Sequence, residues 1–130
     1  MLEIMPKIKL KRILKGLGYH KMELSILFTD DNHIAELNRR FLKREGPTNV
    51  LAFSMRGDDK EPETLMLGDV VISLDAAMRD AKIDDVSLNK TVDRLLIHGL
   101  LHLLGYDHEK SDQEARRMEE ETERLLKIMK

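Results

Sequence analysis

Apolar residues recur along this chain at two spacings, and the spacing separates expected strands from expected helices. From Met22 to Thr29 every second residue is apolar, which predicts a strand. Apolar runs over Val50–Ser54 and Leu65–Ser73 predict two more strands, and a hairpin could join them across the polar loop at 56–64. Gly68 interrupts the third strand, which predicts a bulge or a close backbone approach there.

The remaining apolar positions recur every three to four residues, which is the spacing of amphipathic helices. The predicted helices cover Pro6–Leu17, about Asp31–Phe41, Asp75–Lys82, Leu88–Leu104 and a segment that opens with the capping box Ser111–Glu114. In the second helix we expect Ile34, Leu37 and Phe41 to form the buried stripe. The fourth helix is apolar around most of its circumference, so it should be central and buried.

This order of elements predicts an α+β fold, in which helices pack on a small mixed sheet. The length of 130 residues suits one domain over 1–130, large enough to bury a core without covalent cross-links. No internal repeat or low-complexity tract divides the chain.

The composition narrows the chemistry that the domain can perform. Because the chain has no cysteine, it has no disulfide partner, and a transition metal would need His, Asp or Glu ligands. No apolar run approaches the roughly 20 residues that span a bilayer, so no membrane association is expected. The first residues lack the features of a secretory signal, which favours a cytoplasmic protein.

Charge is distributed unevenly between the two parts of the chain. Residues 1–48 carry ten Lys or Arg and six Asp or Glu, a balance of +4, whereas residues 49–130 carry twelve and eighteen, a balance of −6. A basic face of this kind can meet a polyanion, although charge alone favours ordinary solvated surface. With three Phe, two Tyr and no Trp, binding of single strands by aromatic stacking is not indicated.

Three of the five histidines lie within eleven residues, in the most apolar part of the chain. His98 and His102 are four residues apart in the predicted central helix, so their imidazoles project from one face. Gly105 can reverse the chain and return His108 toward the same point. Three imidazoles with a fourth position open to water are typical of catalytic zinc, whereas structural zinc usually has four protein ligands.

Two aspartates are further candidates for the site. Asp107 could orient a ligating imidazole or accept a proton, or it could be a turn residue that bonds its own backbone. Asp69 lies in an apolar strand, where a carboxylate needs a partner such as an imidazole or an arginine, and this favours a functional role.

The same histidine spacing occurs in metzincin proteases, which read HExxHxxGxxH. Their general base is the glutamate that follows the first histidine. Here that position is Gly99, which argues strongly against a protease.

The sequence resembles the YbeY-like endoribonucleases, which are also described as rRNA maturation factors. The resemblance rests on three segments, His98–His108, Gly46–Ser54 and Leu67–Ser73. It implies a zinc-dependent endoribonuclease that prefers single strands and acts in rRNA maturation and ribosome quality control, with ribosomal RNA or the small subunit as partner. It also implies His98, His102 and His108 as the ligands of one Zn²⁺ ion.

One position departs from the family pattern. The family usually carries an arginine five residues before the proline of the second segment, and this chain has Leu42 there, followed by Lys43 and Arg44. We expect a set of basic residues to hold RNA electrostatically, namely Lys43, Arg44, Arg39, Arg40, Lys11 and Lys15.

Two other functions remain open at this point. The chain could be a ribosome-associated RNA-binding factor whose metal is mainly structural, and a fourth protein ligand such as Asp69 or Asp107 would favour that. A metalloprotease-like hydrolase is the third and weakest alternative.

Overall fold

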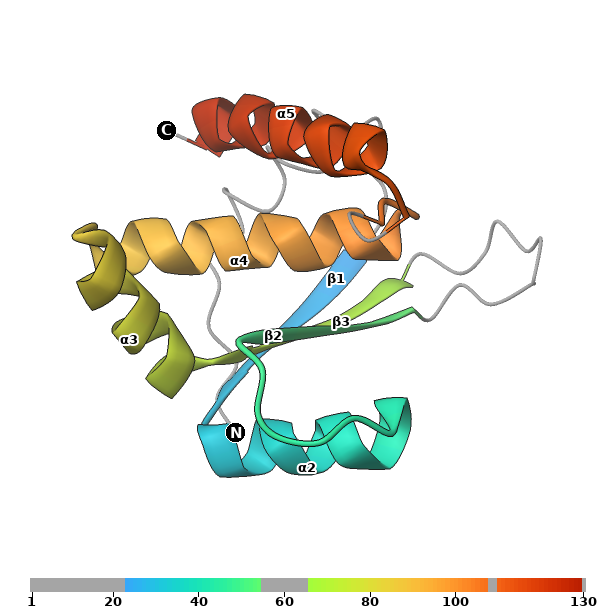
Figure 1. Ribbon diagram of the computed structural model, residues 1–130, viewed down its shortest axis with the longest axis vertical. Helices are drawn as coiled ribbons and strands as arrows, with labels where there is room; N and C mark the ends of the chain where they lie inside the picture. Colours follow the sequence, from blue (N-terminus) through green and yellow to red (C-terminus); the bar gives the residue numbers. More distant parts are fainter. Residues whose placement is uncertain (1–22, 55–65, 108–109, 130) are drawn as a thin grey trace.

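A computed structural model of the chain describes residues 23–54, 66–107 and 110–129. Within these ranges the elements follow the order βαββααα, and a three-stranded sheet lies between helices (Figure 1). This confirms the predicted α+β class with a mixed sheet. The predicted helix over Pro6–Leu17 and the predicted loop at 56–64 lie outside the described residues.

The sheet has the strand order β1–β3–β2. Strand β1 (Glu23–Thr29) runs parallel to β3 (Met66–Ser73), whereas β2 (Val50–Ser54) runs antiparallel to β3. The three predicted strands and the antiparallel pairing of the last two are therefore confirmed. As the central strand, β3 has helices over both faces, and Val70, Val71 and Ile72 are accordingly buried in succession.

Each helix begins where its sequence provides an N-cap. The helices are α2 (Asp31–Leu42), α3 (Leu74–Asp84), α4 (Leu88–Leu103) and α5 (Asp112–Met129). Asp30, Ser73 and Ser87 cap the first three, and the Ser111 hydroxyl accepts from the Glu114 backbone N–H at the start of α5.

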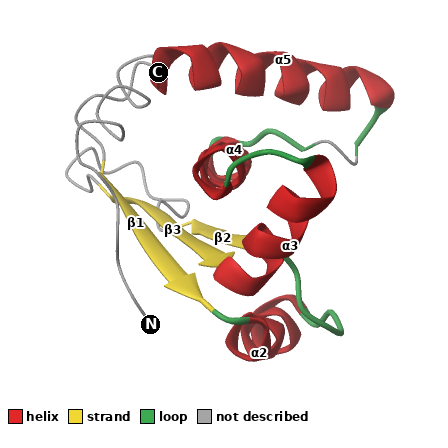
Figure 2. Ribbon diagram, turned by 90° about the vertical axis from the view of Figure 1, so that its left-hand side faces the viewer, coloured by secondary structure: helices red, strands yellow, loops and turns green. Residues whose placement is uncertain are grey.

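The helices form layers on the two faces of the sheet (Figure 2). Helix α2 covers one face, where Ile34, Leu51 and Val71 form a small core. Helix α4 packs on the opposite face, and α5 covers the far side of α4. Because α4 lies between the sheet and α5, it is buried on two sides, as its apolar circumference predicted.

Gly68 shows both features that were predicted for it. The pairing of β1 with β3 shifts register between Glu23 and Leu24, opposite this part of β3. A Cβ atom at Gly68 would lie 2.2 Å from the Phe53 carbonyl oxygen and 3.0 Å from Cδ2 of Leu103. Only glycine lets β3 approach β2 and α4 this closely.

The predicted burial of Phe41 is wrong. Its side chain is 57% exposed, and the residues of α2 that are buried are Ile34 and Asn38. The Phe41 ring contacts Phe53 edge-on, with centroids 5.6 Å apart. Phe41 shares a helix face with Ile34 and Asn38, but it lies in the last turn of α2, where burial depends on neighbours that hydrophobic periodicity does not reveal. Among the described helices, none is long and apolar enough to span a membrane.

Candidate metal and RNA site

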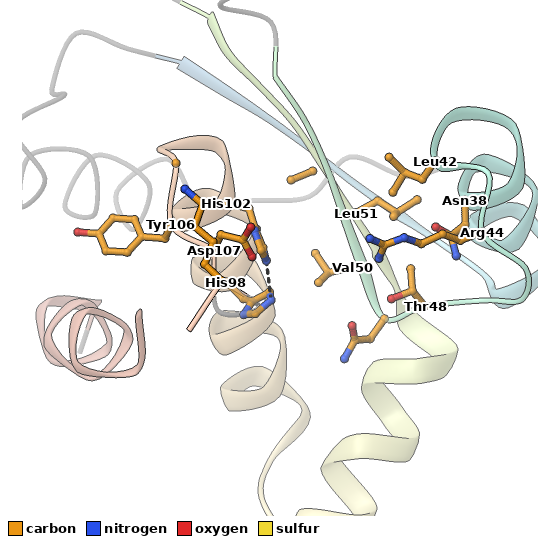
Figure 3. A pocket seen from close by; sticks show the side chains of 15 residues that line it. Asn38, Leu42, Arg44, Thr48, Val50, Leu51, His98, His102, Tyr106 and Asp107 are labelled. Atoms are coloured by element: carbon orange, nitrogen blue, oxygen red, sulfur yellow. Dashed lines mark hydrogen bonds between the residues drawn. The ribbon is translucent and has the colours of Figure 1, made fainter. Parts of the chain in front are cut away.

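Helix α4 places two imidazoles together at its C-terminal end. His98 and His102 are both half-buried, and their Nε2 atoms lie 3.1 Å apart. Their ring centroids are 4.6 Å apart and the rings are inclined at 75° (Figure 3). The i, i+4 spacing therefore brings both nitrogens to one point, as predicted.

This geometry fits a shared metal ion. Two nitrogens bound to one zinc ion at about 2.0–2.1 Å in tetrahedral geometry lie about 3.3 Å apart, close to the observed Nε2–Nε2 distance of 3.1 Å. Within the described ranges no third His, Asp or Glu joins the pair to complete a metal site. His108 lies outside the described residues, so the three-histidine ligand set stays a prediction.

The turn after α4 has the geometry predicted from Gly105. Its φ is 101°, in the left-handed region, and its N–H donates to the His102 carbonyl oxygen at 3.1 Å. The Tyr106 N–H donates to the Leu101 carbonyl oxygen at 3.0 Å, which completes a Schellman motif. The reversal returns the chain over the end of α4, so that Asp107 lines the same hollow as the histidines.

That hollow has a volume of about 670 Å³ and two walls. The histidine wall consists of α4 and the chain after it, with His98, Gly99, His102, Gly105, Tyr106, Asp107 and Lys110. The loop wall consists of α2, β2 and the segment between them, with Asn38, Leu42, Arg44, Thr48, Asn49, Val50, Leu51 and Ala52. Figure 3 shows the two walls facing each other.

Of the predicted basic residues, Arg44 is the one that the described structure places in the hollow. Leu42, at the position of the family arginine, also lines it, but Lys43 does not. Arg39 lies on the exposed surface of α2, 3.9 Å from Glu36, and the Arg40 guanidinium lies 5.9 Å from the Phe41 ring centroid. Lys11 and Lys15 lie outside the described residues.

Asp69 lies on the sheet face away from the histidines. Its neighbours Gly68 and Val70 face α4, so alternation directs Asp69 to the α2 face. It pairs across the strands with Phe53, which packs in the core beneath α2. The expected imidazole partner is therefore not the His98–His102 pair.

Gly99 explains why this helix carries no glutamate after its first histidine. A Cβ atom at this position would lie 2.7 Å from Cγ1 of Val70 and 3.3 Å from Cγ2 of Val50. The helix thus packs directly on β3 and β2 at the level of the histidines. A protease-type general base has no room there, which agrees with the argument against a protease.

Sequence reasoning missed four residues of the hollow, Asn38, Thr48, Asn49 and Lys110. Asn38 could have been found, because it follows Ile34 by four residues and so places an amide on a buried helix face. Thr48 and Asn49 could have been found too, because they lie in the Gly46–Ser54 segment that carries the family resemblance, whereas Lys110 carries no local signal.

The comparison with known proteins agrees with the motif and the fold. Residues 5–130 match the family model described as endoribonuclease YbeY. The chain belongs to the endoribonuclease YbeY family. This confirms the resemblance found in the sequence, and it places the chain in a family of hydrolytic enzymes.

Relatives in this family come from distant organisms. The chain is 45% identical over 121 residues to endoribonuclease YbeY of Geobacter metallireducens, which covers 92% of this chain and 81% of the relative. It is 46% identical over 107 residues to the Aquifex aeolicus protein of the same name, covering 82% and 70%. The solution structure of TM1509 from Thermotoga maritima has a TM-score of 0.66 at 27% identity, covering 95% of this chain and 77% of that one.

Proposed function

We propose that this YbeY family member cuts single-stranded ribosomal RNA at the hollow between the histidine wall and the loop wall. It would use one divalent ion, for which zinc is the expected metal, held by His98, His102 and His108. The observation that carries the proposal is that two converging imidazoles, with Nε2 atoms 3.1 Å apart, share one hollow with Arg44.

The donor set suits a catalytic transition metal. Imidazole nitrogens bind zinc and its neighbours in the periodic table well. When bound, such an ion supplies Lewis-acid stabilisation to the phosphodiester as negative charge develops on its oxygens.

The described residues of the hollow suit an RNA backbone. Arg44 and Lys110 line it together with Asp107, so its fully charged side chains sum to +1. Arg44 can hold a phosphate through two parallel hydrogen bonds. A volume of about 670 Å³ is within the usual range of small-molecule pockets. Such a pocket suits one nucleotide of a single strand whose base is unstacked.

Asp107 is our candidate for the residue that handles a proton. It lines the hollow beside the histidines, it directly follows the Schellman turn, and its carbonyl oxygen accepts from the Lys110 N–H at 3.3 Å. We assign it the orientation of an imidazole or the acceptance of a proton from the attacking group. Asp69 has no part in this scheme, because it lies on the other sheet face.

The test compares metal content with cleavage. The purified protein is stripped with a chelator, then reloaded with zinc, and each form is incubated with one labelled RNA in single-stranded and duplex form. We expect cleavage of the single strand by the reloaded protein, and loss of cleavage after stripping. Undiminished cleavage by protein shown to be metal-free would overturn the proposal.

The same experiment separates the enzyme from an RNA-binding factor with a structural metal. If the metal were structural, stripping would lower the melting temperature, and the reloaded protein would bind ribosomal RNA without cutting it. A cleaved single strand together with an uncut duplex supports the enzyme.

A further inference from the structure

The segment that carries Arg44 has an unusual backbone. Lys43 ends α2 in the left-handed conformation, with φ 57° and ψ 36°, and Gly46 has φ 87°. A left-handed residue other than glycine costs roughly 1–2 kcal/mol. The side chains from Lys43 to Pro47 are exposed, so burial does not hold this segment in place.

Hydrogen bonds to a single buried residue hold it instead. The Nδ2 group of Asn38 donates to the Gly46 carbonyl oxygen at 2.9 Å. The Asn38 carbonyl oxygen accepts from the backbone N–H groups of Lys43 and, at 3.3 Å, of Arg44. Asn38 is only 5% exposed, so its position is set by the packing of α2 on the sheet.

Arg44 lies between Lys43 and Gly46, whose backbone groups are both bonded to Asn38. Its side chain reaches from the loop wall into the hollow (Figure 3). No carboxylate of the described residues forms an ion pair with it, whereas Arg39 lies near Glu36 and Arg79 is paired with Asp31. Ligand binding costs conformational entropy in the side chain and in the backbone that carries it, and a backbone that is already fixed removes the second of these costs.

We propose that Asn38 is the positioning residue that sets Arg44 opposite the histidines, so that it acts on RNA affinity through Arg44. The Asn38 backbone carbonyl holds the start of the segment, as any residue there would, and the specific contribution of the asparagine is the bond from its side chain to Gly46. This inference rests on the proposed function, because it assumes that Arg44 contacts RNA in the hollow.

The test is a double-mutant cycle between Asn38 and Arg44. Asn38→Leu fills the buried position with a branched side chain but removes the bond to Gly46. Asn38→Ala is the second variant in case the first does not fold. Each is combined with Arg44→Gln, and kcat, KM and the salt dependence of RNA binding are measured where every variant is folded. We expect each single change to raise KM about tenfold with kcat nearly unchanged, and the double variant to equal Arg44→Gln alone.

Salt dependence distinguishes positioning from a merely structural role. Arg44→Gln should lower the slope of log affinity against log salt by roughly 0.7, the value for one phosphate contact on a single strand. Asn38→Leu should lower it by a similar amount. Thr122→Val is the matched control, because it removes another buried polar group, whose hydroxyl donates to the Met118 carbonyl oxygen at 2.7 Å in α5. Whatever its effect on the melting temperature, it should leave the slope unchanged.

The possible failures are separable. If the effects of the Asn38 and Arg44 changes multiply, or if Asn38→Leu leaves the salt slope intact while Arg44→Gln lowers it, the positioning role is refuted and the proposed function stands. If Arg44→Gln alters neither KM nor the slope, the RNA-binding role of the loop wall fails, and the positioning role fails with it.

Discussion

The histidine wall and the loop wall border one hollow, but different forces hold them. The histidine wall rests on a helix that packs so closely on β3 that Gly99 has no room for a Cβ atom. The loop wall is exposed near Arg44, and backbone hydrogen bonds to Asn38 hold it there. The difference teaches that the metal-binding groups are fixed by core packing, whereas the cation for the substrate is fixed by polar contacts, of which the bond from the Asn38 side chain to Gly46 can be removed by one substitution.

The largest effect should follow from removal of a histidine of the first wall. His98→Ala leaves one nitrogen of the pair, so we expect loss of bound metal and at least about a 100-fold loss of cleavage. Metal content and single-turnover cleavage measure the two effects. His33→Ala is the matched control, because His33 is an exposed histidine of α2, and it should behave like the unchanged protein. Full activity of a metal-free His98→Ala protein would contradict the assignment.

The next effect tests the close packing behind the histidines. In Gly99→Ala the new Cβ would lie 2.7 Å from Cγ1 of Val70, which is fully buried. Overpacking of this kind costs about 1–3 kcal/mol, which exceeds the gain of about 1 kcal/mol for alanine in a helix. Urea unfolding should therefore show a net loss of stability, together with weaker metal binding. An unchanged or raised midpoint would show that α4 can shift away from the sheet.

A smaller effect is expected from the corresponding change in the loop wall. Gly46→Ala introduces no clash, since nothing lies within 4 Å of the added Cβ, but φ is 87° there. The strain is about 1–2 kcal/mol, and the segment can relieve part of it by moving. We expect weaker RNA binding and unchanged metal affinity, measured by titration of each ligand. Weaker metal binding would show that the two walls are not independent.

The smallest effect concerns pH. Arg79, whose Nη1 lies 2.7 Å from Asp31 Oδ2, holds the pKa of Asp31 below its ordinary 3.8, with help from the Ser73 hydroxyl and against the effect of burial. A lowered pKa stabilises the fold above pH 3.8, and the stabilisation is lost as pH falls through the lowered value.

Asp31→Asn should therefore be less stable than the unchanged protein at neutral pH, and the difference should shrink in acid. Urea unfolding at several pH values measures it, with Asp84→Asn, which removes an exposed carboxylate at the end of α3, as control. A difference that is constant down to pH values well below 3.8 would contradict the pairing.

Local sequence patterns predicted most of the elements and half of the site. Val50–Ser54 was predicted to the residue, because breakers flank a short apolar run. The Gly105 turn and the convergence of His98 and His102 follow from backbone geometry within one turn of helix. The predicted burial of Phe41 was wrong although its helix face was right, because whether the last turn of α2 is covered depends on residues distant in sequence.

By itself the sequence determined where helices and strands form, that two imidazoles share a helix face, and that the family is YbeY-like. These properties depend on periodicity, caps and short motifs, which act over a few residues. Only the tertiary structure decided that Arg44 rather than Lys43 enters the hollow, that Asp69 faces the other way, and that Asn38 holds the loop. The first and second outcomes depend on how the strands pair and how α2 and the following loop lie against them, and the third depends on the loop path that brings the Gly46 carbonyl to the Asn38 amide.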